Sequence, residues 1–454
     1  MGFMAIRRSR KHYIARPKGS SFKRIRPHHI HITAATLLTI GAVIFLSTGV
    51  FVAKKTMVVH GPNPATVMRG LAETKGVTSS TATTAPASSP SPATIAKPSS
   101  SLPASGATAP ALASLVTAKA YGIAAGGGLT SLSQQELDLY FTQLKELGTT
   151  WVRWDIDWNV VQPQNQTHYN WTPTDRVANT AKKYGISSLA IITYTPKWAR
   201  SSACVDSPKC RPADMQAFGK FAETVASRYK SSVTHWEIWN EPNYKAFWEP
   251  RPNSHEYAEL LKAAYLGIKK VSPSAIIVTG GLAASGNEED GSRSPLTFVT
   301  GLYERGANAY YDIVALHPYT YPASTDYIAW WNSWQQMGPV RDLMIAQGEA
   351  SKKIWITEYG APTGGPGNSF TVDQFDKFTY GSDHMSENAQ AMLASQAIAG
   401  YSARTDWLGP FFWYSLKDLS SNRDNPENFF GLLRSNNTKK PAYDIIYREA
   451  HSLQ

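Results

Sequence analysis

Short β-rich runs alternate with longer amphipathic stretches from residue 120 to the end of the chain, and this alternation constrains the fold more than any other feature. Eight runs have the length and the β-branched and aromatic content that are typical of strands. They are 120–125, 150–158, 188–195, 234–240, 275–280, 313–318, 353–359 and 409–415. Eight helical candidates accompany them, at 134–147, 174–184, 213–229, 256–271, 296–305, 340–347, 388–403 and 442–451. This order predicts an α/β protein with a (β/α)8 barrel.

An open, doubly wound sheet is the alternative arrangement for alternating strands and helices. Such sheets often carry a glycine-rich phosphate-binding turn between the first strand and a helix that starts directly after it. Gly126, Gly127 and Gly128 follow the first expected strand, but they lack that spacing and no helix starts close behind them. We therefore interpret the three glycines as a loop and favour the barrel.

The first part of the chain contains a stretch that is long enough to cross a membrane. Residues 32–53 carry no charge, and residues 1–31 before them carry nine Lys or Arg and no acid. A helix of about 20 apolar residues spans the hydrocarbon core of a bilayer. A cleaved signal peptide is the alternative, but its apolar region is usually shorter, and here Lys54 and Lys55 follow directly. The pattern predicts a retained transmembrane helix at 32–53, with the basic tail 1–31 in the cytoplasm.

Composition separates this anchor from the folded part of the chain. After a juxtamembrane segment at 54–76, residues 77–118 contain 34 Ser, Thr, Ala or Pro among 42 and predict a disordered linker. The net charge is +13 over residues 1–118 and −2 over residues 119–454. The basicity therefore belongs to the anchor, and we expect the extracellular domain 119–454 to bind no nucleic acid.

Two expected barrel strands end in glutamate. The fourth ends in W-E-I-W-N-E-P-N, which contains Glu237 and Glu241, and the seventh ends in I-W-I-T-E-Y-G, which contains Glu358. Side chains at the carboxyl ends of barrel strands meet over the mouth of the barrel. Two facing carboxyl groups supply what cleavage of a glycosidic bond needs, a proton donor for the leaving oxygen and an anion at the sugar carbon. Glu237 lies deeper, where an ion pair with Arg153 or a lysine is expected.

The motifs W-N-E-P at 239–242 and T-E-Y-G at 357–360 carry a family resemblance. Over about residues 119 to 452 the chain resembles retaining (β/α)8 glycoside hydrolases with the acid/base on strand four and the nucleophile on strand seven. It is most similar to glycoside hydrolase family 39 and related bacterial glycosidases. The resemblance implies that Glu241 is the acid/base and Glu358 the nucleophile, and that Asn240 binds the 2-hydroxyl of the sugar.

The same resemblance implies further substrate-binding residues. Arg153 in W-V-R-W-D would hydrogen-bond near the nucleophile and keep it ionised, and His317 and Tyr319 in H-P-Y-T-Y would flank it. Trp413 in F-F-W-Y matches a platform on which a sugar ring stacks. Two further aromatic residues, at positions 158 and 198, are candidates for stacking on a sugar, and for Trp158 core packing is the alternative.

Cys204 and Cys210 are the only cysteines in the chain. Outside the membrane a short disulfide between them is favoured over two free thiols, and two cysteines lack the further ligands of a structural zinc site. The expected chemistry needs no metal and no cofactor.

The sequence predicts a membrane-tethered glycosidase whose partner is a carbohydrate, an oligo- or polysaccharide. A catalytically silent carbohydrate-binding surface protein and a transglycosylase with the same two glutamates are the alternatives. The sequence leaves open the sugar, the linkage, exo or endo cleavage and the oligomeric state.

Overall fold

The computed structural model describes residues 119–329, 332–372 and 384–453. The predicted tail, membrane span, juxtamembrane segment and linker, at 1–31, 32–53, 54–76 and 77–118, lie outside these ranges. None of the helices within the described ranges combines the length and the apolar character that a membrane span requires.

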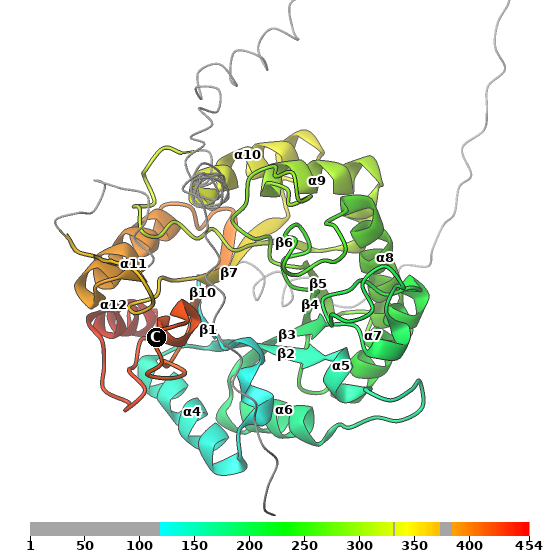
Figure 1. Cartoon of the computed structure of the whole chain (residues 1–454), viewed down its shortest axis with the longest axis horizontal. Helices are drawn as coiled ribbons and strands as arrows, with labels where there is room; N and C mark the ends of the chain where they lie inside the picture. The colour runs from blue at the N-terminus through cyan, green and yellow to red at the C-terminus, as the bar shows by residue number, and fades with distance from the viewer. Residues whose placement is uncertain (1–118, 330–331, 373–383, 454) are drawn as a thin grey trace, which may run out of the picture. The chain divides into compact units, whose positions relative to one another are not determined.

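Eight parallel strands close into a barrel, as Figure 1 shows in a view down the ring of strands. In chain order they are β1 (Tyr121–Ala124), β2 (Trp151–Asp157), β3 (Ser187–Thr193), β4 (His235–Ile238), β5 (Ile276–Thr279), β6 (Ile313–Leu316), β7 (Lys353–Tyr359) and β10 (Leu408–Tyr414). Each strand pairs with its neighbours in sequence, and β10 pairs with β1 to close the ring. The predicted (β/α)8 barrel is confirmed.

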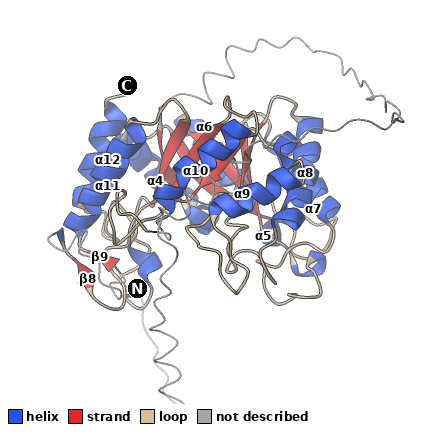
Figure 2. Cartoon of the chain, turned by 90° about the horizontal axis from the view of Figure 1, so that it is seen from above, coloured by secondary structure: helices blue, strands red, loops and turns tan. Residues whose placement is uncertain are grey.

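Helices surround the barrel on its outside (Figures 1 and 2). They are α4 (Gln134–Leu147), α5 (Trp158–Val161), α6 (Thr172–Tyr184), α7 (Met215–Tyr229), α8 (Ser254–Val271), α9 (Pro295–Glu304), α10 (Ser333–Ala346), α11 (Glu387–Ser402) and α12 (Pro441–His451). Their starts follow from local chemistry. Ser133 and Glu136 form a reciprocal capping box at the start of α4, and the Asn253 side chain accepts two backbone N–H groups at the start of α8.

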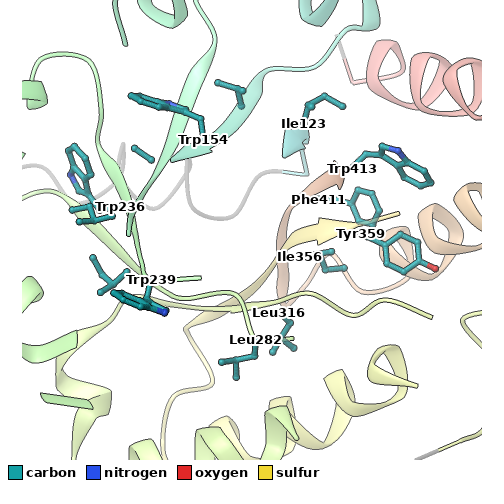
Figure 3. Packing of buried hydrophobic residues seen from close by; sticks show 14 of the residues in the cluster. Ile123, Trp154, Trp236, Trp239, Leu282, Leu316, Ile356, Tyr359, Phe411 and Trp413 are labelled. Carbon is teal, nitrogen blue, oxygen red and sulfur yellow. The ribbon is translucent and has the colours of Figure 1, made fainter. Parts of the chain in front are cut away.

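Alternation along β2 divides its side chains between two cores. Trp154 and Ile156 face the helices and belong to the large cluster between barrel and helices, part of which Figure 3 shows. Trp151 packs inside the barrel in a second cluster that includes Trp355 and Phe412. Arg153 shares the parity of Trp151, as do Asp155 and Asp157, because successive side chains of a strand point to opposite faces. The interior face of β2 therefore rises from an aromatic floor to charged residues at the barrel mouth.

The structure departs from the expected elements at several places. The short helix α5 was not expected, and the glycines at 126–128, interpreted as a loop, begin a 3-10 helix at Gly126–Ser131. β4 ends at Ile238 rather than at residue 240, because Trp239 takes a left-handed backbone conformation with φ of 69°. α10 begins at Ser333, well before the expected 340, and continues through Pro339. Two short strands that were not expected, β8 (Ser369–Phe370) and β9 (His384–Met385), pair with each other outside the barrel (Figure 2).

Candidate active site

Arg153 anchors the charged residues at the mouth of the barrel. Its side chain is only 1% exposed, and its Nε and Nη2 donate to the two carboxylate oxygens of Glu237 at 2.7 and 2.8 Å. Nη2 also donates to Asn240 Oδ1 at 2.8 Å, and Nη1 contacts Glu358 Oε1. The expected interior ion pair of Glu237 with Arg153 is confirmed. One buried cation on β2 thus orients residues from β4, from the segment after β4 and from β7.

The segment after β4 turns out of the strand so that Glu241 reaches the cavity. Trp239 and Glu241 both have positive φ, 69° and 47°, which non-glycine residues rarely adopt. The backbone N–H of Glu241 donates to Gly281 O at 3.0 Å, and Trp239 Nε1 donates to Phe247 O at 2.8 Å. These contacts hold a strained backbone in place, a feature that is concentrated at functional sites.

The two glutamates meet through a short set of contacts. His317 Nδ1 lies 2.9 Å from Glu241 Oε1, and its Nε2 lies 3.1 Å from Thr357 Oγ1. Tyr319 donates its hydroxyl to Glu358 Oε2 at 2.8 Å. A carboxylate oxygen of Glu241 and one of Glu358 lie within 4.8 Å of each other, with His317 in the same group. The structure therefore brings together two carboxyl groups from distant parts of the sequence.

A cavity of about 810 Å³ opens over this pair. Arg153, Asn240, Glu241, Tyr319 and Glu358 all line it, which places five of the predicted site residues around one space. His317 is fully buried behind the wall, where its Nδ1 lies 2.9 Å from Glu241 Oε1 and 3.6 Å from Glu358 Oε2. This volume falls in the usual range of ligand pockets.

Burial and neighbouring charges set the protonation of the two carboxyl groups. Burial raises the pKa of Glu241, the negative Glu358 adds to the rise, and the hydrogen bond from His317 opposes it. Burial also raises the pKa of Glu358, while the charge of Arg153 and the Tyr319 hydroxyl act in the opposite direction. Glu358 therefore has a cation and a hydroxyl donor to stabilise its anion. Among the described residues, the side-chain hydrogen-bond partner of Glu241 is an imidazole whose own pKa is lowered by burial.

Glu241, His317 and Glu358 offer one oxygen or nitrogen atom each within 4.8 Å of one another, which is close enough for metal ligands. Arg153 already places its positive charge against Glu358. A divalent cation at this position would sit beside that guanidinium, so the charge distribution favours a sugar over an ion.

Three predicted stacking residues do not line the cavity, and these predictions are corrected. Trp413 is fully buried next to Tyr359 and Phe411 in the core between barrel and helices (Figure 3). Trp158 is also fully buried, stacked on Phe221 with its Nε1 donating to Gln162. Trp198 packs edge-on against Trp158 and donates to Gln162 O at 2.9 Å. The indoles of Trp158 and Trp413 fill gaps between elements, and the partly buried Trp198 packs against the same core.

Other residues that the sequence analysis did not assign to substrate binding form much of the wall. They are Asp155, Asp157, Tyr194, Lys209, Tyr244, Phe247, Tyr321, Tyr414, Glu427 and Phe430. Tyr414 directly follows Trp413, so the strand was identified but the wrong side of its pleat was chosen. The parity of Asp155 and Asp157 with Arg153 on β2 could have placed them at the cavity.

Gly281 permits the close approach of His317, and this yields a testable prediction. A Cβ at position 281 would overlap His317 Nε2 and lie 2.6 Å from Thr357 Oγ1. Because the imidazole must shift, we expect Gly281→Ala to lower kcat by at least about tenfold, the cost of displacing a group that positions an acid/base.

Gly338 provides the matched control for this substitution. A Cβ there meets nothing within 4 Å, and the residue lies inside α10, where alanine is the better helix former. Gly338→Ala should keep the activity of the unaltered chain in the same assay. Full activity of Gly281→Ala would show that the position of His317 is not critical.

Comparisons with known proteins agree with this geometry. A family model described as glycosyl hydrolases family 39 matches residues 135–346, which include Glu241 and end before Glu358. A family 39 glycoside hydrolase from Bacteroides cellulosilyticus WH2 is 22% identical with a TM-score of 0.56, covering 73% of this chain and 63% of that one. A monomeric beta-xylosidase from Caulobacter crescentus CB15 is 18% identical with a TM-score of 0.55, covering 73% of this chain and 67% of that one.

The closed parallel barrel, with two glutamates facing each other over its mouth, is the arrangement that the sequence analysis expects of a glycosidase. The family model matches residues 135–346, and the predicted resemblance to glycoside hydrolases of family 39 is confirmed. At these identities the solved structures show the shared fold, and this chain spans about two thirds of their length.

Proposed function

We propose that this chain is a retaining glycoside hydrolase in which Glu358 is the nucleophile and Glu241 the acid/base. One observation carries the proposal: carboxylate oxygens of the two residues lie within 4.8 Å in one cavity. Retaining enzymes hold their carboxyl groups about 5 to 5.5 Å apart, whereas inverting enzymes separate them by about 6.5 to 9.5 Å to admit a water. The shorter spacing supports double displacement.

In the first step Glu358 attacks the anomeric carbon while the bond to the leaving oxygen breaks, and Glu241 gives its proton to that oxygen. In the second step a water attacks the glycosyl carbon, Glu241 takes up the proton of the water, and Glu358 leaves as a carboxylate. Neutral His317 donates from Nδ1 to Glu241 Oε1 and accepts at Nε2 from the Thr357 hydroxyl. This hydrogen bond stabilises the Glu241 anion that forms when the proton has passed to the leaving oxygen.

Asn240 and Arg153 prepare the position of the sugar at the cleaved bond. The Oδ1 of Asn240 accepts from Arg153, which directs its amide N–H groups away from the guanidinium. Within the described ranges these N–H groups have no hydrogen-bond partner, and Asn240 lines the cavity. They are therefore available for the 2-hydroxyl of the sugar, as the family resemblance implies.

The pH dependence of hydrolysis tests the two assigned roles. Activity requires Glu358 ionised and Glu241 protonated, so kcat/KM should fall at low pH as Glu358 gains its proton and at high pH as Glu241 loses its own. The His317 hydrogen bond lowers the pKa of Glu241, so removing it in His317→Ala should raise that pKa and move the basic limb to higher pH.

Tyr319→Phe is the complementary variant, measured over the same pH range. The Tyr319 hydroxyl lowers the pKa of Glu358, so its loss should raise that pKa and move the acid limb to higher pH. If the two variants shifted the opposite limbs, the roles of Glu241 and Glu358 would have to be exchanged.

Substrate screening tests the activity itself. The solved Caulobacter structure is named as a beta-xylosidase, so aryl β-xylosides come first, followed by aryl glucosides, mannosides and glucuronides and by oligosaccharides. We expect hydrolysis of at least one, with the first-formed product in the configuration of the substrate. Analysis with an added oligosaccharide acceptor distinguishes hydrolysis from transglycosylation, and binding without turnover would favour a silent carbohydrate receptor.

We also propose that residues 32–53 tether the enzyme to the cell membrane with residues 119–454 outside. The length of this uncharged stretch and the nine cations before it support the proposal. The protein should stay in the membrane fraction after alkaline extraction, and protease added to intact spheroplasts should digest the domain. Release into the medium at a cleaved amino terminus would indicate a signal peptide instead.

A further inference from the structure

The Cys204–Cys210 disulfide closes a short loop after β3. This disulfide loop, residues 204–210, is attached at both sides to neighbouring segments. Pro208 O accepts from Thr195 N at 3.0 Å, and Lys209 O accepts from Glu249 N at 3.1 Å. Ser207 Oγ also donates to Glu249 Oε1 at 2.9 Å. The covalent closure and these hydrogen bonds fix the backbone of Lys209 directly before the buried Cys210.

The side chain of Lys209 extends from this loop into the wall of the catalytic cavity. Its Nζ lies 3.1 Å from the centre of the Tyr194 ring and 5.0 Å from that of Phe247. Both rings line the same cavity. Within the described ranges no carboxylate forms an ion pair with the Lys209 ammonium and no acceptor takes a hydrogen bond from its Nζ, while its backbone N–H donates to Ser207 Oγ at 3.1 Å. An aromatic face occupies one side of an ammonium that carries three N–H donors.

The nearest carboxyl groups do not neutralise this ammonium by contact. Asp155 and Asp157 line the cavity from β2, and Asp157 Oδ1 already accepts from the backbone N–H groups of Asn159 and Tyr194. Burial lowers the pKa of Lys209 to about 8, and the charges of Asp155, Asp157 and Glu241 oppose that change. The chain thus holds a partly buried cation over an aromatic ring, beside acids that it does not touch.

The barrel topology places this cation away from the reacting carbon. In the closed ring of strands, β3 lies directly opposite β7, the strand that ends in Glu358. A sugar unit attacked by Glu358 therefore leaves the β3 side of the cavity to a neighbouring unit of the same chain. The cavity volume of about 810 Å³ exceeds what a single sugar ring requires.

We propose that the disulfide loop holds Lys209 as a specificity-determining contact, whose ammonium donates hydrogen bonds to oxygen atoms of a sugar unit next to the one that is cleaved. Tyr194 and Phe247 supply the apolar surface beneath that unit. This inference rests on the proposed glycosidase function and adds the requirement for an oligosaccharide.

Kinetics with substrates of different length test the contact. We would use whichever of xylotetraose, cellotetraose and mannotetraose the full-length protein hydrolyses fastest, together with the aryl glycoside of the same sugar. Lys209→Met keeps the length of the side chain and removes its charge. It should raise KM for the tetrasaccharide about tenfold, which is the usual loss of affinity when a hydrogen bond to a charged group is removed. Its kcat should stay within about twofold of that of the unaltered chain. KM for the aryl glycoside should not change.

The loop is tested by Cys204→Ser/Cys210→Ser, alone and combined with Lys209→Met. Alone it should raise KM for the tetrasaccharide, and in the combined variant it should add nothing, because the contact that it positions is already lost. Lys182→Met, which alters an exposed lysine on α6, is the matched control and should behave as the unaltered chain. Additive losses would show that the loop acts independently of Lys209.

Calorimetry in the Glu358→Ala background separates this inference from the proposed function. Glu358→Ala/Lys209→Met should bind the tetrasaccharide about tenfold more weakly than Glu358→Ala alone. The unaltered chain could fail to hydrolyse all three tetrasaccharides while this difference in affinity was still measured for one of them. The proposed function would then fail and the contact would stand. Equal KM and equal affinity with and without the ammonium would overturn the contact.

Discussion

Glu358→Ala should abolish turnover, lowering kcat at least about 10⁴-fold, because the residue that forms the covalent intermediate is gone. Sugar affinity should remain, since Glu237 still holds Arg153 and Arg153 still holds Asn240. Initial rates on the best aryl glycoside, with calorimetry on the same variant, measure the two effects separately. Persistent hydrolysis by this variant would rule out Glu358 as the nucleophile.

Azide makes this test specific to the role of each carboxyl group. In Glu358→Ala the anion can enter the space of the lost carboxylate and attack the sugar directly, which gives a glycosyl azide of inverted configuration. In Glu241→Ala the covalent intermediate still forms from an activated aryl glycoside, and azide should release it with the original configuration. The matched pair of products distinguishes nucleophile from acid/base, because each variant lacks only one of the two groups.

Arg153→Met should cause the largest loss of stability among the substitutions considered. The guanidinium is 1% exposed and pairs with Glu237, whose side chain is fully buried. Removing one partner of a buried ion pair leaves an uncompensated charge, at a cost of about 3 to 5 kcal/mol in the free energy of unfolding. The midpoint of denaturant unfolding, followed by tryptophan fluorescence, measures this effect.

The double variant Arg153→Met/Glu237→Gln is the control for that interpretation. It removes the orphaned charge along with the cation, so it should be more stable than Arg153→Met alone. Both variants should remain inactive, because Glu358 loses its cation in each. Equal stability of the two variants would mean that the loss comes from packing around the side chain rather than from an unpaired Glu237.

Much of the barrel could be predicted from the sequence because its signals are local. The expected helix at 134–147 has the same bounds in the structure, where Ser133 and Gly148 cap it. Amphipathic periodicity and capping residues are properties of a few consecutive positions. The expected start of α10 was wrong because the prediction relied on local signals. Pro339 locally disfavours a helix, but in the structure α10 continues through it from Ser333.

The candidate site was only partly predictable, because its walls depend on backbone geometry that the sequence does not display. The two glutamates stand in motifs at strand ends, and the structure places them together. Trp239 and Glu241 have left-handed backbone conformations that break the alternation of side chains after β4. Neither residue type predicts a positive φ. Trp413 and Tyr414 show the remaining difficulty, since a shift of one position decides whether an aromatic ring packs in the core or faces the cavity.

The interior face of β2 bears the floor, the buried cation and part of the wall in a single row of alternate residues. Gaining or losing one amino acid between Trp151 and Arg153 would therefore turn Arg153, Asp155 and Asp157 together toward the hydrophobic layer of helices. Insertions and deletions in this strand should abolish enzyme activity. Length changes in the loops above the strand should be tolerated. Libraries that aim to alter the choice of sugar should therefore vary loop length and leave this strand untouched.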